Sequence, residues 1–220
     1  KSQRQEGDDY LLYLSGFMIY QMKTEIIMSA QNPKIKMLLE LQEKSKTRRR
    51  EGLFVVEGRR ELEHCIATGF EGHTAFICKD ITGEQGFDEI MHVLENASPG
   101  GGRQCSIMEI PGHLYHKVAY RGSTEGVIAE LHCKSHTLKD LDIKSDPLVV
   151  VLESVEKPGN LGAILRSADA SGVDAVIVCD PLTDMYNPNL IRSSIGAIFT
   201  VPVATASSEE TISWLKAQGI

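Results

Sequence analysis

Two uninterrupted apolar runs in the second half of the chain constrain its fold most strongly. Residues 148–152 read LVVVL, and residues 175–179 read AVIVC. Continuous apolar sequence, without alternation, is typical of strands that are buried on both faces of a parallel sheet. Helices are expected at 160–170, 187–194 and 209–217, with a third strand at 199–203. This order predicts a doubly wound parallel sheet over residues 147–220.

The first half of the chain alternates shorter strands and helices. We expect strands at 53–56, 75–78, 105–110 and 126–131, and helices at 35–41, 60–67, 87–94 and 113–118. Residues 33–131 therefore predict a small α/β layer domain. Residues 132–146 are polar without an apolar face, which predicts a linker between two domains. Residues 1–32 form an extension of uncertain origin, and 1–28 are either an amphipathic helix or a segment from outside the native gene.

Composition excludes several classes of protein. The chain has 220 residues, 42% apolar and 24% charged, which rules out a coiled coil, a collagen-like repeat and a fully disordered chain. No apolar run reaches the about 20 residues that span a bilayer. Five cysteines without a C-x-x-C pair argue against a disulfide framework or a structural zinc site. With no secretory signal, we expect a cytoplasmic protein that binds neither membrane nor metal.

Polar residues follow the first apolar strand, where a sheet of this kind binds ligands. Such sites lie outside the carboxyl ends of the strands, here at 153–162, 180–189 and 204–208. We expect Asn160 to cap the next helix, with Arg166 one turn past Gly162 on the same face. An Asn and an Arg at this edge suit an anionic or hydroxyl-rich ligand. Taken alone, the pattern fits a capped helix with a surface arginine better.

The segment after the second strand has the same kinds of residues, and together the two segments favour a ligand site over simple helix capping. It reads DMYNPNLIRSSIG over residues 184–196, with Asn187 before a helix and Arg192 and Ser194 within it. Two Asn/Arg/Ser clusters at one ligand-binding edge are not explained by capping alone. The chain has no GxGxxG, no Gly-Lys-Ser/Thr and no GxSxG sequence. The chain therefore lacks a dinucleotide fingerprint, a phosphate-binding loop and a hydrolase elbow. An α/β hydrolase or another nucleotide enzyme remains only as a much weaker alternative.

These motifs resemble those of a known family. NLGAILR at 160–166 and NPNLIRSSIGAIF at 187–199 are similar to motifs 1 and 2 of the SpoU (TrmH-type) RNA 2′-O-ribose methyltransferases, members of the trefoil-knotted superfamily. FVVEGR at 54–59 and GVIA at 126–129 resemble the ribosomal-protein-L30e-like domain that is often fused to these enzymes. The resemblance implies an L30e-like RNA substrate-binding domain followed by a trefoil-knot methyltransferase domain.

The resemblance also implies an activity and its residues. It implies methyl transfer from S-adenosylmethionine to a ribose 2′-hydroxyl of ribosomal or transfer RNA, by a homodimer. The implied active-site residues are Asn160, Arg166 and Ser194, supported in motif 2 by Asn187, Arg192 and Gly196. A guanidinium stays protonated in proteins. We therefore expect Arg166 to fix ribose and phosphate, while a nearby phosphate takes the hydroxyl proton.

A net charge of −7 conceals one basic segment. Residues 34–60 hold nine Lys/Arg and four Asp/Glu, a local excess suited to RNA phosphates. We expect RNA contacts from Lys46, Arg48, Arg49, Arg50, Arg59 and Lys157. Lys157 stands where the family often has Asp. The alternatives are a solvated helix end for the basic run and a solvated loop lysine for Lys157.

One part of the family pattern does not occur within residues 1–220. The family's third motif has a Gly-rich cofactor loop and a later Ser-Leu-Asn, and neither precedes Ile220. We therefore expect a methyltransferase domain truncated at its C-terminus, and the cofactor-binding residues stay unassigned. The alternative function is a non-catalytic RNA-binding module or an inactive paralogue without the cofactor loop.

Overall fold

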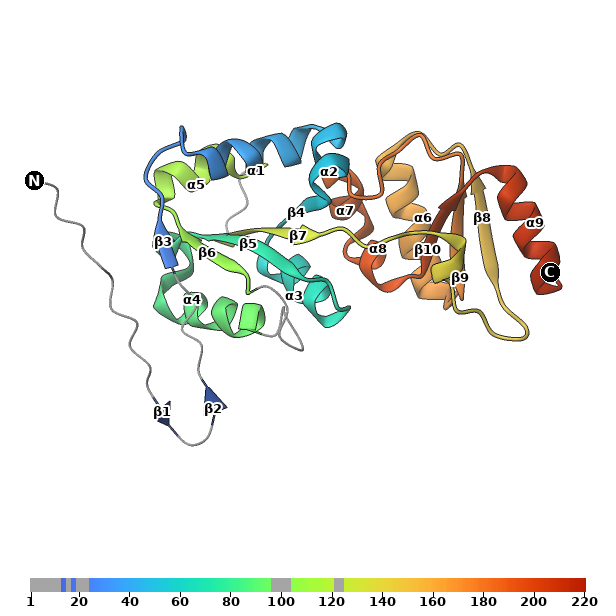
Figure 1. Ribbon diagram of the computed structural model, residues 1–220, viewed down its shortest axis with the longest axis horizontal. Coiled ribbons are helices and arrows are strands. Elements are labelled where there is room, and N and C mark those ends of the chain that lie inside the picture. The colour runs from blue at the N-terminus through green and yellow to red at the C-terminus, as the bar shows by residue number, and fades with distance from the viewer. Residues whose placement is uncertain (1–12, 15–16, 19–23, 96–103, 121–124) are drawn as a thin grey trace, which may run out of the picture.

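The computed structural model describes residues 13–14, 17–18, 24–95, 104–120 and 125–220. It has two α/β units side by side (Figure 1), the first around a five-stranded mixed sheet and the second around a three-stranded parallel sheet. This confirms the predicted α/β fold class. The alternating pattern of strands and helices in the sequence was therefore sufficient to predict both α/β units.

The first sheet has the strand order β3-β6-β5-β7-β4. Its strands are β3 (Thr24–Ile26), β4 (Leu53–Glu57), β5 (Gly72–Ile77), β6 (Ser106–Glu109) and β7 (Val127–His132). β3 and β5 run parallel to β6, and β7 is antiparallel to both of its neighbours. Because β4 is an edge strand of this sheet, it is open to contact with the second unit.

The N-terminal extension is partly strand. β3 belongs to the first sheet, and β1 (Tyr13–Leu14) pairs antiparallel with β2 (Phe17–Met18). The alternative of an amphipathic helix over 1–28 is therefore wrong for these strands. Backbone bonds to β6 fix β3, and Ile27 that follows it is 2% exposed. The other residues before Thr24 lie outside the described part.

Helices cover both faces of the first sheet. α1 (Pro33–Glu43) and α5 (Gly112–Val118) lie on one face, and α3 (Arg59–Ala67) and α4 (Lys79–Glu95) lie on the other (Figure 1). α2 (Ser45–Glu51) follows α1 at the end nearest the second unit. The apolar spacing that predicted α1 is confirmed, since Ile35, Leu38 and Leu41 are fully buried.

The second sheet has the order β10-β9-β8, with β8 (Val149–Glu153), β9 (Ala175–Cys179) and β10 (Val203–Ala206) parallel. α6 (Pro158–Ser171), α7 (Pro188–Ser194) and α8 (Ala197–Thr200) cover one face. α9 (Ser208–Gln218) covers the other, where the Cys179 thiol lies 3.3 Å from Thr211 Oγ1. Helices on both faces make this a doubly wound sheet, as predicted.

Two sequence predictions for the second sheet are wrong in detail. The first apolar run is not buried on both faces, because Leu148 is 55% and Val151 46% exposed. β8 is an edge strand, and α9 packs over β9 and leaves Val151 uncovered by the described residues. The expected strand at 199–203 is instead α8 followed by β10. The apolar residues Ile198 and Phe199 reach a buried position against the first unit without joining the sheet.

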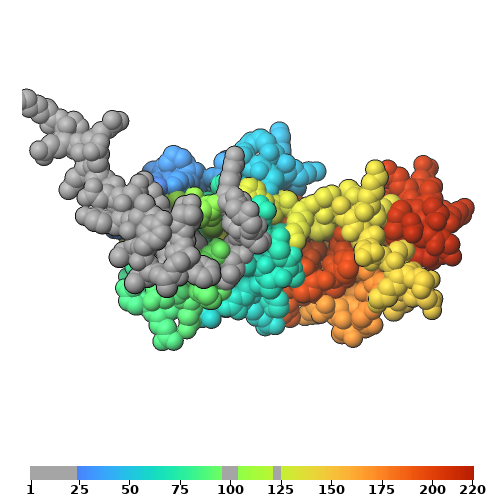
Figure 2. All heavy atoms as spheres, turned by 60° about the horizontal axis from the view of Figure 1, so that its bottom comes forward, coloured from blue at the N-terminus to red at the C-terminus, as the bar shows by residue number. Residues whose placement is uncertain are grey.

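One hydrophobic core runs through both units. Phe54 of β4 stacks on Tyr186, with ring centroids 4.4 Å apart and an interplanar angle of 28°. Phe199 lies 5.9 Å from Phe54 and meets Phe70 edge-on at 5.4 Å. We call these four rings the interdomain aromatic cluster. Figure 2 shows the surfaces of the two units in contact, with teal residues of the first unit against orange-red residues of the second.

The segment predicted to be a linker is docked onto the second unit. The Tyr186 hydroxyl accepts a hydrogen bond from Lys134 N at 2.7 Å and donates one to Lys134 O at 3.1 Å. Thr205 N of β10 donates to His136 O at 2.7 Å. Burial lowers the pKa of the His136 ring, which lies 3.0 Å from the Tyr186 hydroxyl. The polar residues of the segment 132–146 therefore include ones that bind the second unit directly, at Lys134 and His136.

The described residues contain free cysteines, and no metal cluster or membrane-spanning helix is found among them. Four cysteines are buried free thiols and Cys133 is partly exposed. Burial raises the pKa of Cys133 to about 12, so this thiol stays protonated at neutral pH. Within the described ranges, no three His, Cys, Asp or Glu side chains are placed to hold a metal ion. None of the helices described has the length and hydropathy of a membrane span.

Candidate active site

The loops that follow β8 and β9 meet at the carboxyl edge of the parallel sheet. Thr183 Oγ1 donates a hydrogen bond to Glu156 O and ties the two loops together. The first residue after each strand, Ser154 or Asp180, has a left-handed backbone with φ of 50° and 47°. Non-glycine residues in this region cost about 1–3 kcal/mol each and are concentrated at ligand sites. This edge therefore has the character of the ligand site that the sequence predicts.

α6 begins two residues earlier than the sequence predicts. Lys157 is the N-cap residue and Pro158 the first helical residue, because the fixed φ of proline suits the first turn of a helix. Asn160 therefore lies inside the first turn and does not cap it. Its exposed side chain makes no hydrogen bond to any described residue. The amide is available to a ligand.

Arg166 lies on the exposed side of α6, six residues after Asn160. Its guanidinium forms no ion pair or hydrogen bond within the described ranges. A planar group with five donors and no protein partner is suited to bidentate contact with a phosphate or a diol. Asn160 and Arg166 are thus both presented to solvent on the motif 1 helix.

Three consecutive residues of α7 have different surroundings, because successive helical residues are rotated by about 100°. Arg192 lines a cavity between the two units. Ser193 packs against α6. Ser194 is fully buried, and its Oγ donates to Ile191 O at 2.8 Å. In this structure the Ser194 hydroxyl does not reach the surface, and the predicted active-site role of Ser194 stays a prediction.

Ser193 is a packing position between α6 and α7 that the sequence analysis did not identify. Its Oγ donates to Pro158 O and to Leu190 O, both at 3.2 Å. A Cβ on Gly162 would lie 2.1 Å from Ser193 Oγ and 2.8 Å from the Ser193 carbonyl carbon. Only glycine allows α6 and α7 to approach this closely. The signal in the sequence was Gly162 itself, whose contact partner could not be identified there.

We expect Gly162→Ala to lower the free energy of unfolding by about 1–3 kcal/mol. The added methyl group would meet a backbone atom of Ser193 that cannot move aside. Thermal unfolding followed by circular dichroism measures the effect. Gly159→Ala is the matched control, since a Cβ there meets nothing within 4 Å. Equal melting temperatures for the two variants would contradict the close contact.

Asn187 and Gly196 have local structural roles. The Asn187 side chain caps α7 by accepting a hydrogen bond from Asn189 N at 2.9 Å. Gly196 has φ of 87°, and a Cβ there would lie 3.2 Å from the His64 ring. Left-handed Ile195, with φ of 52°, precedes it. These residues shape the turn between α7 and α8 and bring it against α3.

The structure corrects one predicted RNA contact. Arg48 is only 3% exposed, and its Nε pairs with Asp184 Oδ2 at 2.7 Å. Its Nη1 donates to Leu41 O at 2.6 Å. A guanidinium buried in this way cannot reach an RNA backbone. α2 packs against the motif 2 loop of the second unit, and Arg48 lies on the side of the helix that faces it.

The other predicted RNA-contacting residues are exposed or partly exposed: Lys46, Arg49, Arg50, Arg59 and Lys157. Arg50 pairs with Glu51 at 2.6 Å, and Arg59 pairs with Glu63 at 2.7 Å and with Glu89. The remaining three form no ion pair with a described residue. Exposed ion pairs contribute little energy, so all five stay accessible to phosphates.

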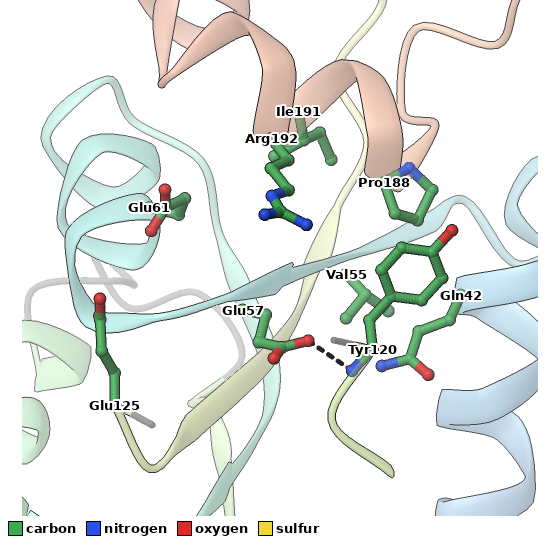
Figure 3. Close-up of a pocket in the computed structure, with 9 residues that line it drawn as sticks. All are labelled: Gln42, Val55, Glu57, Glu61, Tyr120, Glu125, Pro188, Ile191 and Arg192. Atoms are coloured by element: carbon green, nitrogen blue, oxygen red, sulfur yellow. Dashed lines mark hydrogen bonds between the residues drawn. The ribbon is translucent and has the colours of Figure 1, made fainter. Parts of the chain in front are cut away.

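A cavity of about 240 Å³ separates α7 from the first unit (Figure 3). Arg192 enters it from α7, while Glu57, Glu61 and Glu125 enter it from the first unit. The Glu57 carboxylate accepts a hydrogen bond from Tyr120 N at 2.7 Å. The cavity thus joins a motif 2 arginine to an acidic wall.

Comparison with known proteins agrees with these features. Residues 147–220 match the SpoU rRNA Methylase family, and residues 32–129 match the MRM3-like substrate binding domain. A crystal structure of an RNA 2′-O ribose methyltransferase shares 32% identity with a TM-score of 0.69, over 89% of this chain and 70% of that one. This chain belongs to the SpoU family. The sequence resemblance is therefore confirmed.

SpoU relatives are known from several bacteria. A Synechocystis protein named as an uncharacterized tRNA/rRNA methyltransferase is 30% identical over 84% of this chain and 64% of its own length. A 23S rRNA (uridine(2479)-2′-O)-methyltransferase of Streptomyces viridochromogenes is 36% identical over 42% of this chain and 32% of its own. A Bacillus subtilis 23S rRNA (guanosine(2553)-2′-O)-methyltransferase is 39% identical over 33% of this chain and 29% of its own length. The chain thus aligns with between 29% and 64% of the length of these relatives.

The SpoU fold also occurs in a cofactor complex. The SpoU methyltransferase AviRb from Streptomyces viridochromogenes, solved with AdoMet, has a TM-score of 0.74 to this chain at 24% identity. The alignment covers 86% of this chain and 69% of the AviRb chain. In this chain, SpoU motif 1 forms the start of α6 and motif 2 forms α7. The two motif helices meet at the contact between Gly162 and Ser193.

Proposed function

We propose that this SpoU-family protein methylates a ribose 2′-hydroxyl of ribosomal or transfer RNA, with S-adenosylmethionine as methyl donor. The contact between the two motif helices at the carboxyl edge of the sheet carries this proposal. The match of residues 32–129 to a substrate-binding domain supports it. The names of the Streptomyces and Bacillus relatives, both rRNA 2′-O-methyltransferases, point to the same reaction.

The residues of motif 1 act on the RNA. The Arg166 guanidinium donates two hydrogen bonds to a ribose and its phosphate, and the Asn160 amide binds the ribose hydroxyls. The bound 2′-oxygen is then aligned for attack, and its proton passes to a phosphate oxygen of the RNA. Alignment of this kind contributes up to about 7–11 kcal/mol in the best intramolecular cases. Arg166 stays protonated throughout.

The backbone at the carboxyl edge of the sheet has a feature that is common at small-molecule cofactor sites. The strained backbone at Ser154 and Asp180 lies at the ends of two neighbouring strands, where ligands of such sheets bind. S-adenosylmethionine supplies, when bound, an electrophilic methyl group on a sulfonium. We assign no individual residue to its binding. Ser194 contributes by fixing the end of α7 through its bond to Ile191 O.

RNA phosphates bind exposed cations of both units. Lys46 and Arg49 lie on the outer side of α2, and Arg50 follows them. Arg59 at the start of α3 and Lys157 at the N-cap of α6 complete this set. Each contact with a phosphate releases a counterion, so binding weakens as the salt concentration rises. We further propose, from the family resemblance, a cytoplasmic homodimer with a trefoil-knotted methyltransferase domain.

A methyl-transfer assay tests the proposed function. Tritiated S-adenosylmethionine is incubated with the protein and either ribosomal or transfer RNA, and the 2′-O-methyl position is mapped in the labelled RNA. We expect label in one RNA class at a defined nucleotide. Titration calorimetry with S-adenosylmethionine accompanies the assay. RNA binding without cofactor binding or methyl transfer would favour the alternative, a non-catalytic RNA-binding module.

A further inference from the structure

We propose that the interdomain cavity binds an unstacked guanine base of the RNA substrate. The proposal rests on the proposed action on RNA and adds to it a specificity site. Single-stranded RNA is read by proteins through bases that leave the stack and present their edges to side chains. The cavity lies between the substrate-binding unit and the motif 2 helix, so a base bound there would be gripped by both.

Two opposite charges face this cavity without contacting each other. Arg192 points into it from α7, and Glu61 of α3 lies on its other side (Figure 3). Neither side chain forms a hydrogen bond or an ion pair with any described residue. A carboxylate and a guanidinium that share a cavity but do not pair can both bind one ligand placed between them.

The remaining charges indicate which ligand is excluded. Glu57 and Glu125 also line the cavity, so the described residues that line it carry three carboxylates against one guanidinium. Glu57 accepts a hydrogen bond from Tyr120 N and Glu125 accepts one from Arg59 N. This negative surplus repels a phosphate, so the cavity does not hold the RNA backbone. It fits a neutral group with hydrogen-bond donors on one edge and acceptors on another.

Guanine has this arrangement of edges. Its N1–H and N2–H₂ groups are adjacent donors that a carboxylate such as Glu61 can accept together, and its O6 and N7 atoms accept from an arginine. Each of the other three RNA bases lacks one of these two edges. With Glu61 on one side and Arg192 on the other, the cavity therefore matches guanine better than adenine, cytosine or uracil.

The rest of the lining suits the flat faces of a base. Val55 of β4 and Pro188 and Ile191 of α7 provide apolar surface, and the ring of Tyr120 stands beside them (Figure 3). Aromatic and apolar side chains are common stacking surfaces for unstacked RNA bases. Ser193, the neighbour of Arg192, packs on motif 1. A base held by Arg192 is thus linked through α7 to the helix that carries Arg166.

Fluorescence anisotropy with short labelled oligouridines tests the proposal. The probes carry one central guanosine, inosine or adenosine, and inosine lacks only the N2 amino group of guanosine. We expect the protein to bind the guanosine probe about tenfold more tightly than the other two. Glu61→Ala should abolish this preference. Glu63→Ala is the matched control on the same helix, because Glu63 pairs with exposed Arg59 and does not line the cavity.

A second variant separates base recognition from phosphate binding. Lys46→Gln combined with Arg49→Gln should weaken all three probes alike and flatten the salt dependence. Excess free guanosine should compete only weakly, since it lacks the phosphate contacts. Equal affinities for the three probes, or a guanosine preference that survives Glu61→Ala, would overturn the cavity proposal alone. Absence of all RNA binding would overturn the proposed function as well.

Discussion

Replacing Arg48 by alanine should lower the free energy of unfolding by about 3 kcal/mol. Removing one partner of a buried ion pair typically costs 3–5 kcal/mol. The lower end applies because Asp184 retains 16% side-chain exposure, against 3% for Arg48. The variant would also leave Leu41 O without its hydrogen bond. At roughly 2–4 °C per kcal/mol for a chain of this size, the melting temperature should fall by about 10 °C.

Arg49→Ala is the matched control for this measurement. Arg49 is the next residue of α2, carries the same charge and is exposed, so its loss should change stability by less than about 0.5 kcal/mol. A double-mutant cycle of Arg48→Ala with Asp184→Ala would isolate the energy of the pair itself. If the two single arginine variants melted together, the ion pair would not hold α2 to the second unit.

Replacing Arg166 by alanine should reduce the methylation rate by about 10²–10³-fold while leaving stability unchanged. Losing one preorganised donor at a reacting group has an effect of this size. Arg166 is exposed and forms no hydrogen bond or ion pair with a described residue, so the fold should not depend on it. Single-turnover methyl transfer measures the rate, and thermal unfolding measures the stability.

The neighbouring position supplies the control for Arg166. Ser167 is exposed on the same helix, and its hydroxyl only donates to Ala163 O at 3.2 Å. Ser167→Ala should therefore retain wild-type turnover. Arg166→Lys keeps the charge but loses the bidentate geometry, and should recover only part of the rate. Near-normal methylation by Arg166→Ala would refute the role of Arg166 in aligning the ribose.

Local sequence patterns predicted most secondary structure correctly but did not reveal that Ser194 is buried. The spacing of Ile35, Leu38 and Leu41 predicted a helix, because one buried face needs apolar residues every three or four positions. Ser194 belongs to a polar RSS run that reads as exposed chemistry. In the structure the rotation of α7 turns it into the core. Which face of a short helix is buried depends on what packs against it.

In the basic segment, too, the sequence predicts one property and only the structure decides another. A run of cations at 46–50 correctly indicates a charged α2, since charge belongs to the residues themselves. The run does not reveal that Arg48 alone faces inward, because its partner Asp184 lies 136 positions away in the chain. Similarly, the stretch beginning at Phe199 was predicted to be a strand, whereas Phe199 lies in α8. Its contact with Phe54 exists only when the two units are together.

The sequence by itself determined the α/β class, the order of the two units and the SpoU motifs. These depend on periodicity, on apolar runs and on residues that are neighbours in the chain. Only the tertiary structure decided that Arg48 joins the units, that Gly162 contacts Ser193 and that Arg192 faces Glu61 across a cavity. Each of these depends on the distance between side chains far apart in sequence. Packing sets that distance, and no local pattern contains it.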